Sequence, residues 1–440
     1  MVNPTNHTCR YTKDLPAAGR YDVVVCGGGP AGIGAAVAAA EHGAKTALIE
    51  RFGFLGGMAT AGYVDPMSEF AYNGKRIIGG IPWRFVRQLQ ELGGALIEEP
   101  RCNVSFDPEK YKLAAQRMVA AAGAECLMNT FLADCIMAGD RVRAAVIVNK
   151  SGMSIVEGDY FIDATGDADL AHFAGVPMQP RNRECQPGTL CFCLANVDTS
   201  TERMHIIHQH NHRFNHQAVF VRDALFALRE KGVEVPQFGG PWLCTTLNEG
   251  CITVNFTRAA MDAVDSRDYQ RAETRMREDA FRLVELIKAH VPEFRNCFIV
   301  STATMAGIRE SRRIRGLHTV TGEEYVNSVH YPDSVARVCH PVDIHLPGGE
   351  GQSLTFPKNA GYIPYRSMIT EAVPNLLAAG RCISADEEAF AAIRVQAPCM
   401  ELGQAAGIAA ALCRKAGNLP VGELDPRRLV DAVRKAGSPV

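Results

Sequence analysis

The sequence lacks the features that mark several large classes of protein. Its 15 cysteines form no CxxC pair and have no regular spacing, which argues against a disulfide framework and an iron–sulfur ligand set. A formal charge of -2 offers no basic surface for nucleic acid. The first residues show no basic stretch before an apolar core, and no apolar run is long enough to span a membrane. We therefore expect a cytoplasmic protein with reduced thiols and with neither nucleic-acid nor membrane partners.

The length and composition indicate a globular protein with more than one domain. At 440 residues the chain exceeds one ordinary hydrophobic core. A hydrophobic content of 47% and a charged content of 21% are typical of globular proteins. We expect two or three domains.

A dinucleotide-binding fingerprint lies near the start of the chain. An apolar run precedes a GxGxxG turn, a small-residue helix follows from Ile33 to His42, and a second apolar run ends at Glu50. This order predicts the strand, turn, helix and strand of a Rossmann-type unit, in which the helix N-terminus attracts a pyrophosphate and the acid binds ribose hydroxyls. The residues of the turn are Gly27, Gly29, Pro30, Ala31 and Gly32.

Two later stretches are expected to touch the same ligand. The glycine-rich loop RFGFLGGMAT comes directly after Glu50, so we expect Gly57 and Met58 to line the central part of the ligand. Helices predicted at 81–92 and 110–122, the second with Asp107 as N-cap, are followed by a β-meander at 125–133, 143–149 and 155–161. The meander runs into Ala164-Thr165-Gly166, whose short side chains would let the chain pass beneath a cofactor.

The pattern changes between the two halves of this unit. Strands are predicted at 185–197 and 251–257, with amphipathic helices at 217–231 and 267–290, the latter with Ser266 as N-cap. A short buried strand at 375–381 and a small-residue helix at 398–415 then return to the style of the first part. We divide the chain into a nucleotide-binding part (1–175), an inserted α+β substrate or cap domain (176–340) and a closing part (341–440).

The motifs GGGPAGIGAA, GFLGGMAT, IDATGDADLA, GIRESRRIRG, VDIH, NLLAAGRCIS and RVQAPCMELGQAAGIAAAL occur in the order of a known family. Together they resemble the FAD-dependent oxidoreductases of the glutathione reductase-like flavoproteins with two dinucleotide-binding domains, and distantly the flavoprotein subunits of fumarate reductase and succinate dehydrogenase. The resemblance implies an α/β fold with a Rossmann-like FAD-binding domain, a β-meander and an inserted cap domain, and it implies FAD as the cofactor.

The resemblance also implies which residues hold FAD. Glu50 would bind the adenosine ribose, the glycine turn the pyrophosphate, and the strand and helix near the C-terminus the flavin. Besides the turn residues named above, the residues expected to bind FAD are Glu50, Arg51, Gly57, Met58, Thr165, Gly166, Gly380, Arg381 and Gln404. No second GxGxxG follows a strand, which argues against a built-in NAD(P)H domain and for a separate electron donor or acceptor.

Two clusters are candidates for the substrate side. Arg309 and Arg312 lie in the arginine-rich run GIRESRRIR and would bind a carboxylate or phosphate, the alternative being arginines that are solvated or paired with acids. In Val342-Asp343-Ile344-His345, β-like alternation places Asp343 and His345 on one face, where the carboxylate would raise the basicity of the imidazole. The alternative is a histidine that is hydrogen-bonded within a hinge between two domains and has no catalytic role.

Several other residues carry weaker expectations. Tyr362, Tyr365 and Arg366 would line the same cavity or serve packing, and Arg394 and Gln396 would touch flavin or substrate. Cys399 is either a covalent anchor for FAD or a buried thiol. The histidines between His205 and His216 have helical spacing, but no third ligand type accompanies them, so we expect a polar surface segment and no metal.

These observations favour an FAD-dependent dehydrogenase or reductase. It would transfer a hydride between flavin N5 and a small polar organic substrate, with His345 as acid or base, and it could form homo-oligomers. Two alternatives stay open: a non-redox, synthetic or RNA-modifying flavoenzyme of the same superfamily, such as a thiazole-forming one, and a flavin-binding sensor without turnover.

Overall fold

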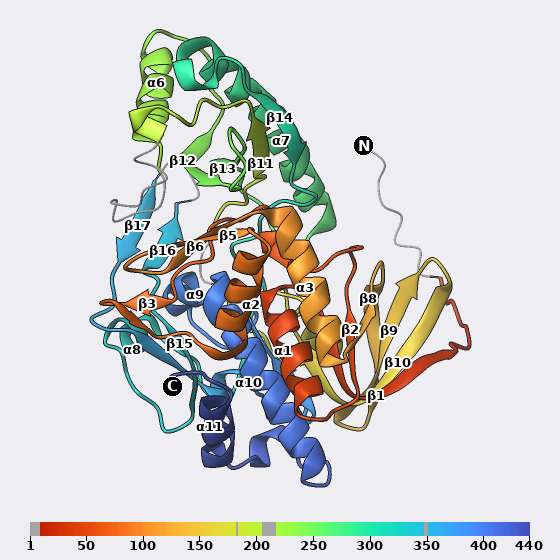
Figure 1. Ribbon diagram of the computed structural model, residues 1–440. Coiled ribbons are helices and arrows are strands. Elements are labelled where there is room, and N and C mark those ends of the chain that lie inside the picture. Colours follow the sequence, from red (N-terminus) through yellow and green to blue (C-terminus); the bar gives the residue numbers. More distant parts are fainter. Residues whose placement is uncertain (1–8, 182–183, 205–216, 347–350) are drawn as a thin grey trace.

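A seven-stranded sheet carries the glycine-rich turn (Figure 1). The computed structural model describes residues 9–181, 184–204, 217–346 and 351–440. The strand order is β7-β2-β1-β10-β9-β8, and β19 also pairs with β10. The strands are β1 (Ala17–Cys26), β2 (Thr46–Ile49), β7 (Glu125–Leu127), β8 (Phe131–Ala138), β9 (Arg141–Asn149), β10 (Gly152–Asp163) and β19 (Leu376–Ala378). The central strands are parallel and apolar, as strands covered on both faces must be.

The predicted meander is shifted along the chain. The stretch 125–133 is not one strand, because it divides into β7, which pairs in parallel with β2, and the start of β8. Strands β8, β9 and β10 form the antiparallel meander, with turns at Gly139 (φ +66°) and Gly152 (φ +109°). Strand β10 then runs parallel to β1, so its C-terminal end lies beside the glycine turn.

Helices α1 (Pro30–Glu41) and α10 (Gln396–Lys415) pack with their backbones almost in contact. A β-carbon added to Gly403 would lie 1.9 Å from the carbonyl oxygen of Ala31, and one added to Gly34 would meet the backbone of α10 at 2.2 Å. Any larger side chain would force the helices apart. The small-residue pattern of both helices therefore brings their N-terminal turns to one place.

Further helices and separate two-stranded sheets pack around the seven-stranded sheet (Figure 1). The helix predicted at 110–122 is confirmed, and Asp107 caps it by accepting hydrogen bonds from the backbone N–H groups of Glu109 and Lys110. The helices are α2 (Gly80–Glu91), α3 (Pro108–Ala122), α4 (Asp169–Phe173), α8 (Gly322–Val326), α9 (Glu387–Ile393) and α11 (Pro426–Lys435). The two-stranded sheets pair β3 (Ala71–Tyr72) with β4 (Lys75–Arg76), β5 (Ala95–Glu98) with β6 (Asn103–Phe106), β15 (Ser334–Val338) with β18 (Gly361–Pro364), and β16 (Val342–His345) with β17 (Gln352–Thr355).

A second lobe stands at the top of Figure 1 and has a hydrophobic core of its own. It is a four-stranded antiparallel sheet in the order β12-β13-β11-β14, with two helices against it. Its elements are β11 (Phe192–Ala195), α6 (Val219–Glu230), β12 (Phe238–Thr245), β13 (Ile252–Thr257), α7 (Ser266–His290) and β14 (Phe298–Thr302). The predicted N-cap Ser266 is wrong by one residue, because the Asp265 carboxylate accepts the N–H groups at the start of α7.

The predicted α/β class is confirmed, whereas the division into three domains stays a prediction. Strand β15 precedes the predicted boundary after residue 340, yet it pairs with β18 beyond that boundary. None of the fifteen cysteines, all of which lie in the described ranges, forms a disulfide bond. Within the described ranges, no helix combines the length and the apolar character needed to cross a membrane.

Candidate active site

One cavity is lined by both the glycine turn and the second lobe. The turn side has Gly27, Gly29, Pro30 and Ala31. We call eight other lining residues the cap side. They are Thr189, Cys191, Trp242, Asn255, Arg309, Asp343, His345 and Arg394.

The turn after β1 is closed by glycines. Gly27 has φ +103°, and a β-carbon there would lie 2.4 Å from the carbonyl oxygen of Ala164. Helix α1 begins at Pro30, and Gly29 as its N-cap offers no side chain to the first free N–H groups. These N–H groups and the positive end of the helix dipole are suited to a phosphate.

Glu50 ends β2 and lines the same cavity. It is buried, and its Oε2 accepts the N–H of Gly28 at 2.7 Å while Oε1 accepts that of Phe52 at 2.8 Å. Burial raises the pKa of this carboxyl, although the two backbone N–H groups act in the opposite direction. The carboxylate is thus held in place beside the turn, as a ribose-binding acid requires.

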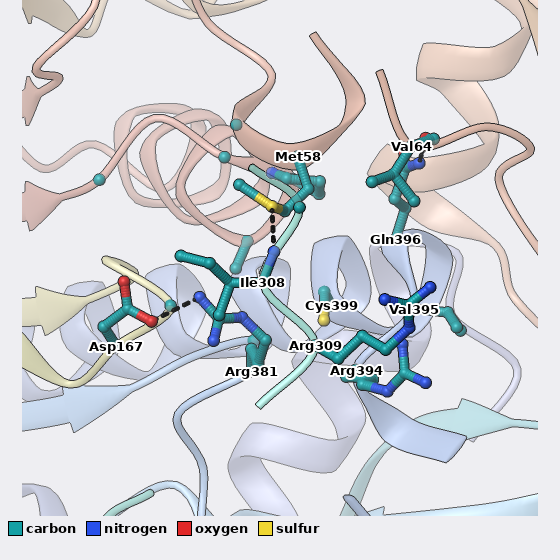
Figure 2. A pocket seen from close by; sticks show the side chains of 18 of the residues that line it. Met58, Val64, Asp167, Ile308, Arg309, Arg381, Arg394, Val395, Gln396 and Cys399 are labelled. Atoms are coloured by element: carbon teal, nitrogen blue, oxygen red, sulfur yellow. Dashed lines mark hydrogen bonds and ion pairs between the residues drawn. The ribbon is translucent and has the colours of Figure 1, made fainter. Parts of the chain in front are cut away.

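The loop after Glu50 folds against the turn. A β-carbon at Gly57 would come within 2.8 Å of the Gly29 Cα, so the two glycines nearly touch. Met58 lies opposite Ile308, whose N–H points to the methionine sulfur at 3.5 Å (Figure 2). Arg51 lines the cavity and stacks over the Phe52 ring, 4.9 Å from its centroid.

The ends of β10 and β19 complete this part of the wall. Thr165 and Gly166 follow β10, and Gly380 (φ +86°) and Arg381 follow β19; all four line the cavity. Arg381 donates to Asp167 Oδ1 at 2.7 Å (Figure 2) and to the Ser311 hydroxyl at 2.7 Å. Glycines where a side chain would intrude, uncapped N–H groups and a fixed acid together fit the pyrophosphate and ribose of a dinucleotide.

Two predicted cofactor residues serve packing instead. Gly32 does not line the cavity, and its hydrogen faces the Gly27 carbonyl oxygen, where a β-carbon would lie at 1.7 Å. Gln404 lies two turns into α10, and its amide accepts from Ile81 N–H at 2.5 Å and donates to the Ser438 hydroxyl at 2.9 Å. It therefore caps α2 rather than touching the cavity.

Arg312, predicted as catalytic, does not line the cavity, although its partner Asp169 does. It pairs with Asp169, and its Nε donates to the Asp167 carbonyl oxygen at 2.8 Å. Arg309 does line the cavity and is 8% exposed.

Replacing Arg312 by glutamine should therefore lower stability without affecting flavin chemistry. We expect a loss of about 1 kcal/mol or less in the free energy of unfolding, because the ion pair is partly exposed. FAD content and the rate of flavin reduction should be unchanged. The matched change Arg309→Gln should slow flavin reduction, and equal effects of the two changes would contradict this placement.

His345 and Asp343 meet on the cap side, as alternation along β16 predicts. His345 Nε2 lies 3.1 Å from Asp343 Oδ2, and the imidazole packs edge-on against Trp242. Arg394 donates to the Asp343 carbonyl oxygen at 3.0 Å. An ionised carboxylate has no proton to donate, so Nε2 carries the hydrogen and Nδ1 is the basic atom.

Electrostatics keep this imidazole neutral. The pKa of His345 is lowered to about 3, first by burial and then by the nearby Arg309. Asp343 raises the pKa of His345, as the sequence predicts, but less than those two effects lower it. Burial alone would raise the pKa of Asp343, yet His345 and Arg394 hold it below its ordinary value.

This shift predicts how the stability of the free protein depends on pH. The unfolded chain binds a proton at His345 near its ordinary pKa of 6.5, whereas the folded protein does so only near 3. Protonation of His345 thus favours unfolding. The stability that the neutral imidazole contributes is fully present above pH 6.5 and is lost as the pH falls from 6.5 towards 3. Urea unfolding of wild type and His345→Asn at several pH values should show a smaller loss in the variant; parallel curves would contradict the shift.

The weaker candidates divide between the cavity and packing. Arg394 and Gln396 line the cavity (Figure 2), and Gln396 donates to the Val64 carbonyl oxygen at 2.6 Å. Tyr365 is buried and donates to a backbone carbonyl near the C-terminus. Tyr362 lies under Arg337, and Arg366 pairs with Asp333, so none of these last three lines the cavity.

Sequence reasoning missed several lining residues. Asp65, Thr189, Trp242 and Asn255 come from segments without a motif. Asn255 lies on β13, where polar residues interrupt an apolar strand. This interruption is the one local feature of the sequence that could have pointed to a functional side chain. Whether the other three residues line the cavity depends on how the second lobe packs, which no local pattern in the sequence shows.

Two expectations concern cysteine and histidine. Cys399 lines the cavity and is buried, which raises its pKa to about 12 and keeps it a thiol; a covalent bond to FAD stays an open alternative. The run from His205 to His216 lies outside the described residues. Among the residues that are described, no group of three or more His, Cys, Asp or Glu side chains is placed to hold a metal.

Comparison with known proteins supports the interpretation of this chain as a flavoprotein. A family model described as FAD dependent oxidoreductase matches residues 22–435. Thiamine thiazole synthase from Aeropyrum pernix is 33% identical over 164 residues, which cover 33% of this chain and 55% of that protein. The same enzyme from Methanococcus maripaludis is 31% identical over 163 residues, covering 34% and 58%. This chain thus spans little more than half the length of these curated relatives.

Among solved structures, a flavoprotein/dehydrogenase from Cytophaga hutchinsonii is similar over 94% of this chain and 84% of that chain, with 12% identity and a TM-score of 0.48. The family model extends over almost the whole sequence, whereas the thiazole synthases match about a third of it. The chain therefore belongs to the FAD-dependent oxidoreductase family, it is an enzyme, and its cofactor is FAD.

Proposed function

We propose that this enzyme transfers a hydride between FAD and a small polar organic substrate held at the cap side of the cavity. The observation that carries the proposal is the cavity itself, which joins the glycine turn and Glu50 to His345, Asp343 and Arg309. When bound, FAD supplies a two-electron carrier that accepts or returns a hydride at N5.

The residues of the chain would do the rest. His345 is neutral, so its Nδ1 can take a proton from the substrate as the hydride leaves, or return one in the reverse direction. Asp343 holds the imidazole by accepting Nε2–H, and Arg394 fixes the backbone of Asp343. The second lobe closes over this region and would exclude water from the reacting atoms.

The electrons must then pass to or from another molecule. The sequence has no second dinucleotide fingerprint, which supports an external electron donor or acceptor. A synthetic, non-redox use of the flavin, as the similarity to thiazole synthases would suggest, is the competing candidate; that similarity covers about a third of this chain.

Anaerobic reduction of the FAD-loaded enzyme tests the proposal. The flavin should be bleached by light with an electron donor, and an artificial oxidant should restore its colour. A panel of small alcohols, amines and acids should contain compounds that bleach it in the dark with saturation. A flavin that can be photoreduced but responds to no compound of the panel would favour the sensor; product formation without bleaching would favour the synthetic enzyme.

A further inference from the structure

The cap side of the cavity has an unusual arrangement of hydrogen-bond donors. Arg258 stands behind it, fully buried and outside the lining. The two hydrogens of its Nη1 are shared among three acceptors, Thr189 Oγ1 at 2.5 Å, Asn255 Oδ1 at 2.8 Å and the Thr257 carbonyl oxygen at 2.8 Å. Space for the guanidinium comes from Gly239, where a β-carbon would lie 2.6 Å from Arg258 Nε. A buried arginine therefore contacts two residues that do line the cavity.

These contacts fix what Thr189 can offer to a ligand. Its hydroxyl oxygen also accepts Arg309 Nη1 at 2.7 Å, so both acceptor positions of the oxygen are occupied by guanidinium N–H groups. The hydroxyl hydrogen is the remaining group, and no described residue accepts it. Because Thr189 lines the cavity, it can act there as a donor.

The same reasoning orients Asn255. A guanidinium has donors and no acceptor, so the amide atom that faces Arg258 must be Oδ1. The Nδ2 group then points elsewhere, and it makes no hydrogen bond to the described part of the chain. Asn255 is half-buried and lines the cavity, where it adds N–H donors.

The neighbouring arginines add positive charge. Arg309 and Arg394 lie together at one end of the view in Figure 2, while Arg381 is paired with Asp167 at the other. The Nε of Arg394 is buried without a partner in the described structure. Of the two guanidiniums on the cap side, only that of Arg394 has Asp343 as a counterion, with Asp343 Oδ2 3.6 Å from Arg394 Nη2.

Three other acids lie nearby, and one of them, Glu310, acts on Arg394 but is paired with Arg313 at 3.3 Å. Asp65 lines the cavity, and burial raises its pKa well above the ordinary value, which disfavours its charged form. Glu69 is paired with Arg101 at 2.9 Å. Burial and the mutual repulsion of Arg309, Arg258 and Arg394 lower the pKa of Arg309, as expected where positive charge lacks a counterion.

We propose that the cap side binds the carboxylate of a small organic acid, and that Arg258 is a positioning residue that holds Thr189 and Asn255 as hydrogen-bond donors to it. This inference rests on the proposed function, because the acid would be the substrate. Guanidiniums in excess of acids attract an anion, and their planar shape matches that of a carboxylate.

Binding to the FAD-loaded enzyme tests the inference without turnover. Titration calorimetry, with the flavin absorbance difference as a second readout, compares acetate, lactate and succinate with acetamide, lactamide and succinamide and with inorganic phosphate. At least one acid should bind roughly 10- to 100-fold more tightly than its amide, the range expected for charge-assisted hydrogen bonds. No binding by any acid, equal binding of acids and amides, or a preference for phosphate would overturn it.

The variant Asn255→Asp isolates the donor. Aspartate still accepts from Arg258 but replaces the N–H donors by negative charge, so acid binding should weaken by roughly 10- to 100-fold or more. Asn73→Asp adds the same charge at an exposed turn and should change nothing. If Asn255→Asp does not fold, the pair Thr189→Val and Thr189→Ser decides, since serine alone keeps the hydroxyl. Unchanged acid affinity in a folded Asn255→Asp variant, or in Thr189→Val, would overturn the role of the donors.

The outcomes separate this inference from the proposed function. Acids that bind with the expected selectivity but never bleach the flavin would leave the carboxylate site standing and contradict hydride transfer. A substrate without a carboxylate that bleaches the flavin, with acids failing to compete, would leave hydride transfer standing and overturn the carboxylate site.

Discussion

Replacing Gly29 by alanine should leave the chain folded but weaken its binding of FAD. Gly29 has φ -71°, which any residue adopts, and a β-carbon there meets no atom closer than the Gly57 Cα at 3.8 Å, an ordinary contact. The residue lines the cavity at the uncapped N-terminus of α1, where the pyrophosphate is expected. Crowding a close-packed contact costs about 1–3 kcal/mol, so FAD affinity should fall roughly 5- to 150-fold.

Two other glycine changes bracket this result. Gly422→Ala lies outside the cavity with no atom within 4 Å of the added carbon, and it should retain FAD fully. Gly27→Ala would force a side chain into a positive φ and against the backbone of Ala164, so it should impair folding itself. Fluorescence titration of FAD and thermal melting of the apoprotein measure both properties. Normal FAD affinity in Gly29→Ala would exclude this turn as the phosphate site.

Replacing His345 by asparagine should slow flavin reduction by about 10²- to 10⁴-fold, the usual contribution of a general acid or base. The amide of asparagine can still donate to Asp343, but it cannot take a proton in place of Nδ1. Because the imidazole lines the cavity rather than the glycine turn, FAD content should be unchanged. Stopped-flow mixing of the oxidised enzyme with its substrate under anaerobic conditions measures the rate.

His318 provides the matched control for this change. Its Nε2 lies 3.3 Å from the Glu324 carboxylate and it does not line the cavity, so His318→Asn should reduce its flavin at the wild-type rate. Asp343→Asn should resemble His345→Asn, since an amide can donate to Nε2 and so favour the wrong tautomer. A His345→Asn enzyme that works at the wild-type rate would remove His345 from the mechanism.

A bound carboxylate would also tune His345. The imidazole has a lowered pKa partly because Arg309 and Arg258 are close and short of counterions. A negative charge bound in the cavity beside Arg309 would offset this effect and raise the pKa of the imidazole. The substrate would thus strengthen the base that acts on it.

The sequence was most informative where the backbone itself makes the site. The glycines at 27 and 29, the acid at the end of β2 and the short side chains after β10 all line the cavity, and each stands out in the sequence because its position restricts what can fit. The same constraint explains α10, whose glycines follow from contact with α1. Such requirements are local and leave a pattern in the chain.

Prediction failed where three-dimensional placement decides the role of a side chain. Gln404 shares a helix with cavity residues but lies two turns further along, and Arg312 neighbours Arg309 but faces Asp169. Thr189 and Asn255 become donors through Arg258, which is distant from Thr189 in the sequence. No spacing rule brings such a trio together, because the packing of the four-stranded sheet does.

A crystal structure of the enzyme with FAD bound tests the central claim most directly, namely that one cavity joins the cofactor to the cap side. We predict the pyrophosphate at the N-terminus of α1, the adenosine ribose beside Glu50, and N5 of the flavin turned towards His345 and Arg309. A flavin ring directed away from these two residues, or an adenosine in their place, would contradict the proposed hydride transfer.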